Sequence, residues 1–114
     1  MSNLENVLLG LDMGYTGCKA VAFNSNGQIL SSAYREYSMN YPSPGWVEMD
    51  ANLIWDKACS AICEITSSLP VPIKAMSVSV MGEAFTPVDS KGQPVAPTIT
   101  AFDERGKTEC EYLI

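Results

Sequence analysis

The amino-terminal third of the chain alternates short apolar runs with turns that are rich in glycine and asparagine. Val7–Leu11 is almost wholly apolar, which is typical of a central strand covered on both faces. Residues that favour strands return over Cys18–Phe23 and again over Gln28–Tyr37. Because the turns at 12–17 and 24–27 are short and contain glycine, we expect the three strands to form an antiparallel meander.

The middle of the chain predicts one helix followed by one strand. Asp50 is a typical N-cap residue, and Pro70 and Pro72 end a helix that we expect to reach about Ser68. If this helix is a crossover connection, the strand that follows at Ile73–Val80 lies parallel to the first strand. The apolar residues at helical spacing form the buried face of the helix: Ile54, Ala58, Ala61, Ile62 and Ile65.

The carboxyl-terminal part of the chain gives weaker patterns. Phe85–Val88 is expected to continue the preceding strand or to pair with it. The turn at 89–92 repeats the Asn/Asp-Ser-x-Gly-Gln pattern of the turn at 24–27, so we expect the same hairpin chemistry in both. Asp103 is expected to cap a helix that starts near Ala101. Together the elements predict an α/β fold with a mixed sheet.

Composition and charge exclude several classes of function. The chain has 114 residues, the size of one domain, and its apolar content of 46% excludes a disordered chain. It has 7 Lys and Arg against 13 Asp and Glu, which makes nucleic acid and anionic membranes poor partners. Because these 114 residues contain no histidine, they cannot by themselves supply a Ser-His-Asp triad, a Cys-His pair or a His-ligated zinc site.

The cysteines and the apolar segments indicate a cytoplasmic protein without a membrane partner. No C-x-x-C pair is present, so reduced and mostly buried cysteines are expected rather than a metal site or redox pair. No secretory signal opens the chain, and the apolar run at 7–11 is too short to cross a membrane. The cysteines are Cys18, Cys59, Cys63 and Cys110.

The turn after the first strand is the first candidate site. Gly14 and Gly17 would let backbone amides approach a phosphate, and Thr16 adds a hydroxyl donor. Asp12, at the end of the strand, could hold a magnesium ion directly or through water, and Lys19 adds a positive charge. A plain hairpin that happens to contain glycine and threonine explains the same residues equally well. The segment is not a Walker A loop, which ends in Gly-Lys-Ser/Thr.

Three further segments carry weaker signals. The 44–48 segment, Pro-Gly-Trp-Val-Glu, is best explained as a rigid loop with Trp46 packed on the surface. Glu83 follows the predicted parallel strand and could accept hydrogen bonds from sugar hydroxyls, although an ordinary surface glutamate is slightly favoured. Asp103 is better explained as a helix cap than as a substrate contact. Arg105 would then pair with one of the nearby glutamates, Glu104 or Glu109.

Taken together, these segments resemble the FGGY family of carbohydrate kinases, which includes xylulokinase, gluconokinase and glycerol kinase. Residues 10–20 match the family pattern Gly-Ile/Leu-Asp-x-Gly-Thr/Ser-x-x-x-Lys/Arg-Ala at most positions. The Pro-Gly-Trp-Val-Glu-x-Asp stretch of the family is matched by residues 44–50. Its Glu-containing segment before a Val/Leu-Asp-x-x-Gly turn is matched by 81–92, and its Trp-x-Asp-x-Arg motif by the last elements of 101–105. The order and the spacing agree along nearly the whole chain.

The resemblance implies the ribonuclease-H-like fold of the actin and hexokinase type. It also implies ATP-dependent transfer of the γ-phosphate to a sugar or polyol hydroxyl, with ATP and magnesium as cofactors and Asp12 facing the metal. Such phosphoryl transfer relies mainly on positioning and charge stabilisation. By the resemblance, the phosphate-binding residues are Asp12, Gly14, Thr16, Gly17 and Lys19, and the substrate contacts are Glu83 and Asp103.

Four positions depart from the family pattern. Tyr15 stands where the family carries Thr or Ser, in the phosphate turn. Met81 replaces the common Gln, and Gly82 replaces Arg, His or Met. Ala101 replaces Trp, which removes a stacking surface for the substrate. These changes bear on which sugar or polyol the site accepts.

Family members are several-fold longer than this chain, with a second domain that binds the adenine and a later aspartate that acts as general base. We therefore expect residues 1–114 to be the amino-terminal part of a kinase, without a catalytic base and inactive alone. One alternative is a non-catalytic sugar- or phosphate-binding regulatory module that retains the kinase fold. Another is an actin-class ATPase, which the Pro-Gly-Trp-Val-Glu segment disfavours. Apolar surface that a missing partner normally covers predicts homo-oligomers.

Overall fold

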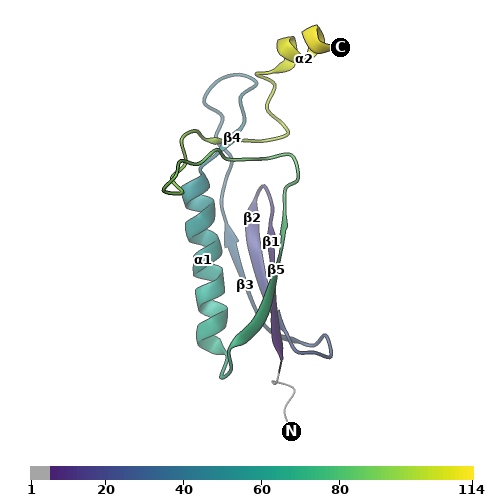
Figure 1. Ribbon diagram of the computed structural model, residues 1–114, viewed down its shortest axis with the longest axis vertical. Helices are drawn as coiled ribbons and strands as arrows, with labels where there is room; N and C mark the ends of the chain where they lie inside the picture. Colours follow the sequence, from purple (N-terminus) through teal and green to yellow (C-terminus); the bar gives the residue numbers. More distant parts are fainter. Residues whose placement is uncertain (1–5) are drawn as a thin grey trace.

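The computed structural model describes residues 6–114, which form a four-stranded sheet, a small two-stranded sheet and two helices. The large sheet has the strand order β3-β2-β1-β5, and α1 packs along it (Figure 1). The small sheet pairs β4 with β6 beyond one end of the large sheet. The elements are β1 (Val7–Met13), β2 (Gly17–Phe23), β3 (Ile29–Glu36), β4 (Glu48–Met49), α1 (Ala51–Ser68), β5 (Ile73–Val80), β6 (Thr98–Ile99) and α2 (Lys107–Leu113).

The meander and the crossover predicted from the sequence are confirmed. β1 pairs antiparallel with β2, and β2 pairs antiparallel with β3. After α1 the chain returns as β5, which pairs in parallel with β1. In this register Asp12 lies opposite Lys19 on one side and opposite Ser79 on the other. The third strand is one residue shorter at each end than the predicted Gln28–Tyr37.

Helix α1 begins and ends where the sequence predicts. The Asp50 carboxylate accepts hydrogen bonds from the amides of Asn52 (2.9 Å) and Leu53 (3.2 Å). These bonds satisfy two of the donors that the first turn of a helix leaves without partners. The helix ends at Ser68, just before the two prolines. Its buried residues are Ile54, Ala58, Ala61 and Ile65, whereas Ile62 is partly buried.

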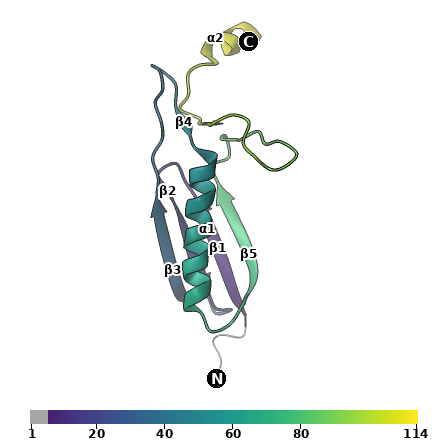
Figure 2. The same cartoon turned by 90° about the vertical axis from the view of Figure 1, so that its left-hand side faces the viewer.

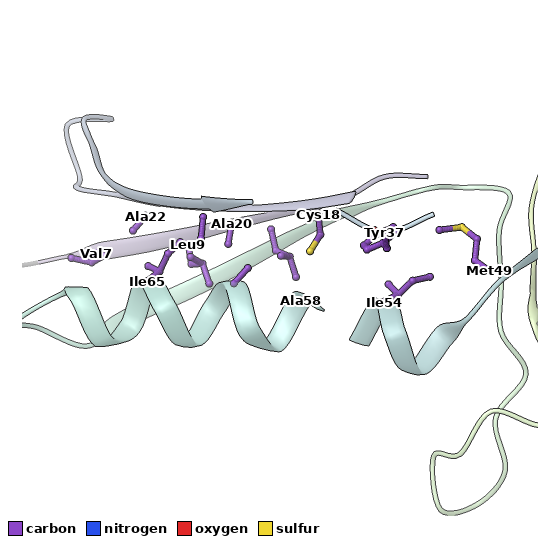
Figure 3. Close-up of a cluster of buried hydrophobic side chains, with 13 residues drawn as sticks. Val7, Leu9, Cys18, Ala20, Ala22, Tyr37, Met49, Ile54, Ala58 and Ile65 are labelled. Atoms are coloured by element: carbon purple, nitrogen blue, oxygen red, sulfur yellow. The ribbon is translucent and has the colours of Figure 1, made fainter. Parts of the chain in front are cut away.

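One face of the large sheet forms the core of the protein. Helix α1 lies in front of this face, between β3 and β5 in the view of Figure 2. Figure 3 shows Val7 and Leu9 of β1 close to Ile65 of α1, with Ala20 and Ala22 of β2 beside them. These side chains are almost completely buried. Full burial of a valine, leucine or isoleucine side chain contributes about 1.5–3 kcal/mol, so this layer carries much of the stability.

The opposite face of the sheet has no covering layer among residues 6–114. Leu8 is 43% exposed, and Asp12 and Lys19 are exposed as well. The prediction that Val7–Leu11 is covered on both faces is therefore wrong for the described chain. A run of apolar residues shows that a strand prefers burial, but it does not show whether the same chain supplies both layers. Helix α1 supplies only one of them.

The two turns of similar sequence have the same structure. In each, the side-chain oxygen of the first residue, Asn24 or Asp89, accepts hydrogen bonds from the amides two and four positions later, at 2.8–3.0 Å. Gly27 and Gly92 have φ angles of 79° and 77°, a left-handed conformation that glycine adopts without strain. The predicted common turn chemistry is confirmed.

The segment after β5 differs from the sequence prediction. Phe85 does not extend β5 but forms an isolated bridge with β6. Helix α2 begins at Lys107 rather than near Ala101, and Asp103 does not cap it. The Asp103 carboxylate instead binds charged and backbone donors that lie far from it in the sequence or beside it in a turn, as described below. Those partners are stronger than the single amide that a helix cap would offer.

The cysteines are only partly buried. Cys18 is buried and Cys59 is half-buried, but Cys63 and Cys110 are exposed, so the prediction of mostly buried cysteines is wrong. The reason is that α1 buries one face only, and α2 has no buried residue. Within residues 6–114 no helix is both long and apolar enough to span a membrane. The same residues contain no cluster of three or more His, Cys, Asp or Glu able to hold a metal ion.

Candidate functional site

The candidate residues gather at one end of the large sheet. Strands β1 and β5 are parallel, and Met13 at the end of β1 pairs with Val80 at the end of β5. The turn at 14–17 follows β1, and Glu83 follows β5 after a short bend. The carboxyl ends of parallel strands are the place where α/β folds bind ligands. The register thus brings two candidate segments, distant in sequence, to the same edge.

The turn at 14–17 is fixed by hydrogen bonds from its own backbone and from the residue after β3. The amide of Gly14 donates to the carbonyl of Gly17 (2.9 Å), which closes the turn. Tyr37 donates its hydroxyl to the carbonyl of Gly14 (2.8 Å) and its amide to the carbonyl of Thr16 (3.1 Å). Burial is the main cause that raises the pKa of Tyr37 to about 12. The hydroxyl therefore remains a hydrogen-bond donor at neutral pH.

Gly17 has a packing role that its place in the turn did not suggest. A Cβ atom at this position would lie 2.6 Å from the carbonyl oxygen of Arg35 in the neighbouring strand, so no larger residue fits without a shift. Gly14 and Gly17 do not have left-handed backbone angles, so the turn is not a nest of alternating left- and right-handed residues. Thr16 is exposed, which leaves its hydroxyl open to a ligand.

Asp12 and Lys19 lie side by side on the open face of the sheet. They are paired in the β1–β2 register, and both are exposed. Within residues 6–114 neither side chain makes a hydrogen bond or an ion pair. They line a shallow cavity of about 210 Å³ together with Gly10, Leu11, Val21, Phe23, Ser77 and Ser79. A free carboxylate, a free ammonium group and two hydroxyls suit a hydrated cation and an anionic ligand.

Two segments far apart in sequence, 45–48 and 99–105, are fastened to each other, and we call this arrangement the clasp. Asp103 lies at its centre, with a side chain that is 2% exposed. Its Oδ2 accepts hydrogen bonds from the Val47 amide (2.6 Å) and from Nη2 of Arg105 (2.7 Å). Its Oδ1 accepts from Nε and the amide of Arg105, at 2.8 and 2.9 Å. The side-chain hydrogen bond from Arg105 is the main reason why the pKa of Asp103 lies well below its usual range.

Arg105 joins the clasp to the small sheet. Its Nη2 also donates to Oε1 of Glu48 (2.7 Å), and its guanidinium carbon lies 4.0 Å from the ring centroid of Trp46. The prediction that Arg105 pairs with Glu104 or Glu109 is therefore wrong. The tertiary fold offers Arg105 a planar, charge-assisted contact with carboxylates and an aromatic face, which neighbours in a helix could not provide. The rigid loop predicted for 44–48 is consistent with this arrangement.

The Asp103 carboxylate has donors on all sides. With four hydrogen bonds inside the chain, its geometry favours a role in fixing the 99–105 segment. A direct contact between Asp103 and a substrate stays a prediction.

Glu83 is exposed in the bend after β5. Its neighbours Met81 and Ala84 line a cavity of about 260 Å³ between this bend, the end of β1 and the start of α1. The cavity is mostly apolar, and its walls include Trp55 and Phe85. A carboxylate beside aromatic side chains suits a ligand that has both hydroxyl groups and C–H surface.

Tyr15 links the turn to the clasp. Its ring centroid lies 4.8 Å from that of Phe102, with an angle of 58° between the rings. Its hydroxyl oxygen lies 3.4 Å from the amide of Ala101, from which it accepts a long hydrogen bond. Two of the positions that depart from the family pattern, 15 and 101, are therefore in contact.

Three groups of residues at this site are not among those predicted from the sequence. Ser77 and Ser79 share the cavity with Asp12, and their alternation in β5 would have placed them there once the parallel register was known. The partnership of Glu48 and Trp46 with Arg105 has no local signal, because the partners are more than fifty residues apart. Tyr37, which anchors the turn, stands just after β3 and gave no signal either.

The sheet order and the crossover helix define an α/β domain of the ribonuclease-H-like class, with a candidate ligand site at the carboxyl ends of its parallel strands. Residues 7–114 match the model of the FGGY family of carbohydrate kinases, N-terminal domain. The chain belongs to this family, as the sequence motifs predicted.

Relatives and solved structures agree with this assignment. The glycerol kinase of Trichodesmium erythraeum is 34% identical over 116 residues, which cover 98% of this chain and 23% of the relative. The glycerol kinase of Trichormus variabilis is 37% identical over 111 residues, covering 93% and 22%. The structure of xylulose kinase from Rhodospirillum rubrum aligns with a TM-score of 0.88 at 26% identity, covering 95% of this chain and 23% of that one. The chain thus spans less than a quarter of the length of the curated relatives that it matches.

Proposed function

We propose that residues 1–114 form the phosphate-facing part of an ATP-dependent kinase that transfers the γ-phosphate of ATP to a hydroxyl of a sugar or polyol. The observation that carries this proposal is the pair of free charges, Asp12 and Lys19, on an open sheet face next to the turn at 14–17. Membership of the FGGY family supports the choice of ATP and of a carbohydrate acceptor.

The residues at this edge fit a nucleotide phosphate and a magnesium ion. Asp12 would hold the ion directly or through water, and Lys19 and the Thr16 hydroxyl would bind phosphate oxygens. The amide of Gly14 closes the turn by donating to the carbonyl of Gly17, and the absence of a side chain at Gly17 lets the turn lie close to β3. A bound magnesium ion would neutralise charge on the phosphates. Because no group of three metal-ligating residues exists in the described chain, phosphate and water oxygens would complete its shell.

Glu83 and Asp103 have different parts in this proposal. Glu83, exposed beside the mostly apolar cavity, would accept hydrogen bonds from the acceptor hydroxyls. Asp103, which already accepts four hydrogen bonds, would act on the substrate chiefly by holding the 99–105 segment in place. Neither residue is proposed as the general base. Without that base, residues 1–114 would bind ligand but would not transfer phosphate by themselves.

Binding of magnesium-ATP to the purified chain tests the proposal. By titration followed through amide resonances, Gly14 and Gly17 should shift on addition of magnesium-ATP. Asp12→Asn should weaken binding about ten- to hundredfold, since it removes a charge-assisted contact. Asp56→Asn, an exposed change on α1, is the matched control and should bind like the unaltered chain. Equal binding by both variants, or no shift at the turn, would contradict the proposal.

We also propose that the chain associates with itself through β5. This strand lies at the edge of the large sheet, its outer side is unpaired within the described chain, and Met76, Val78 and Val80 are each about half exposed. Exposed apolar edge strands favour pairing with another strand. Sedimentation should show concentration-dependent dimers that Val78→Lys abolishes and that Val95→Lys, in an exposed loop, leaves intact. A monomer at high concentration would refute this proposal.

A further inference from the structure

Tyr15 connects two parts of the site that are distant in the sequence: the turn at 14–17 and the 100–102 segment. Within residues 6–114, Tyr15 supplies the one hydrogen bond and the one aromatic contact that join the turn at 14–17 to the clasp. The other hydrogen bonds that hold the turn come from its own backbone and from Tyr34 and Tyr37, at the end of β3. The other hydrogen bonds of residues 100–102 go to Val47 and to neighbours within the same turn.

The two ends of this contact are held independently of each other. The carbonyl of Gly14 and the carbonyl of Thr16, on either side of Tyr15, are both bound by Tyr37. Thr100 donates both its amide and its hydroxyl to the carbonyl of Val47, at 3.2 and 3.1 Å. Because each segment is otherwise held by its own hydrogen bonds, Tyr15 is the side chain through which a shift of one segment can reach the other.

The identity of residue 15 decides whether this span exists. The threonine or serine that the family usually has would end near the start of the tyrosine ring, and it could reach neither Phe102 nor the Ala101 amide. Phe102 is 57% exposed, and among residues 6–114 the ring of Tyr15 is the one aromatic ring that it contacts.

We propose that Tyr15 is a positioning residue that couples the phosphate turn to the 100–102 segment, so that a ligand bound at the turn changes the setting of the sugar-facing segment. The roles of the two segments, one binding phosphate and one facing the sugar, rest on the proposed function. The contact that couples them does not depend on it. Tyr15 acts through its neighbours and makes no chemical step of its own.

Amide hydrogen exchange in the ligand-free chain tests the positioning. Tyr15→Thr should speed exchange at Ala101 and Phe102 about two- to twelvefold. This factor is the change in the opening equilibrium expected when the stabilisation of one aromatic pair is lost. Tyr15→Phe keeps the ring and should restore exchange at Phe102, while the Ala101 amide, without its acceptor, stays faster. Tyr41→Thr, an exposed tyrosine outside the site, is the control. Unchanged exchange at both amides in Tyr15→Thr would overturn the proposal, whatever the chain binds.

Magnesium-ATP tests the coupling separately from the function. In the unaltered chain and in Tyr15→Phe, the Phe102 resonance should move together with those of Gly14 and Gly17, and in Tyr15→Thr only the turn should respond. If the turn responds and Phe102 does not move in the unaltered chain, the coupling is wrong and the proposed function stands. If the turn does not respond, the proposed function fails, and hydrogen exchange alone decides whether Tyr15 positions the segment.

Discussion

Alternate residues of the same strands lie on the two faces of the large sheet, and the two faces differ sharply. Leu9 faces α1 and is 3% exposed, whereas its neighbour Leu8 faces the open side and is 43% exposed. Most side chains of the covered face are apolar, and at its β3 edge the side chains of Ser31 and Arg35 hydrogen-bond to α1. The open face carries the free charges of Asp12 and Lys19 and the hydroxyls of two serines.

This difference shows that alternate positions of one strand have different roles: one set packs the core, and the other presents side chains to a ligand. The apolar side chains under α1 are buried, and their burial stabilises the packing of α1 on the sheet. Those on the open side keep their hydration and charge, and they can therefore meet an anionic ligand. The turn at 14–17 stands where the faces meet, since it is anchored by Tyr37 from the core and leads to Lys19 on the open side.

The largest effect should come from breaking the covered face. Leu9→Ala removes a buried side chain and should lower the free energy of unfolding by about 2–5 kcal/mol. Leu8→Ala, the adjacent residue on the open face, should cost far less, about 1 kcal/mol or below. Urea unfolding followed by circular dichroism measures both. Equal losses would mean that the open face is buried in solution, for instance by self-association.

A smaller loss is expected at the turn. Gly17→Ala forces a Cβ against the carbonyl of Arg35 and should cost about 1–3 kcal/mol through the shift of β3 that it requires. Gly82→Ala is the control, because a Cβ there would meet no atom within 4 Å, and its effect should stay within about 0.5 kcal/mol. The same unfolding experiment compares the two. A tolerated alanine at 17 would show that β3 can move away from residue 17 at little cost.

Removal of the Tyr37 hydroxyl should have a still smaller effect at neutral pH, about 0.5–1.5 kcal/mol for one hydrogen bond. Its pH dependence is distinctive. The folded pKa of about 12 exceeds the usual value of 10.0, so Tyr37 adds stability below pH 10 and loses this contribution as the pH rises from 10 to 12. Unfolding in urea across this range should show a smaller alkaline loss for Tyr37→Phe than for Tyr41→Phe, an exposed control. Identical slopes would contradict the assignment.

The smallest effect on stability is expected from Asp12→Asn. The side chain is exposed and has no ion-pair partner in the described chain, so the free energy of unfolding should change by no more than about 0.5 kcal/mol. Binding of magnesium-ATP should nevertheless fall. A variant that loses ligand binding but keeps its stability would show that the open face serves binding and the covered face serves stability. A large loss of stability would show that Asp12 has a structural partner.

The sequence by itself determined those features that depend on neighbours along the chain. The Asp50 cap, the buried stripe of α1 and the paired turns at 24–27 and 89–92 all follow from contacts within a few residues, and each is confirmed. The family resemblance determined the class of the protein, because its motifs recur in order along the chain.

Only the tertiary structure decided which partners distant residues would choose. Arg105 had carboxylates close by in the sequence but binds Glu48, fifty-seven positions away, where a second carboxylate and an aromatic face converge. Tyr15 meets Ala101 across eighty-six positions. The open face also came from tertiary structure, because alternation assigns residues to two faces, whereas the packing of α1 selects which face is buried. Local sequence fixes local hydrogen bonds; long-range contacts depend on the register and packing that bring separate segments together.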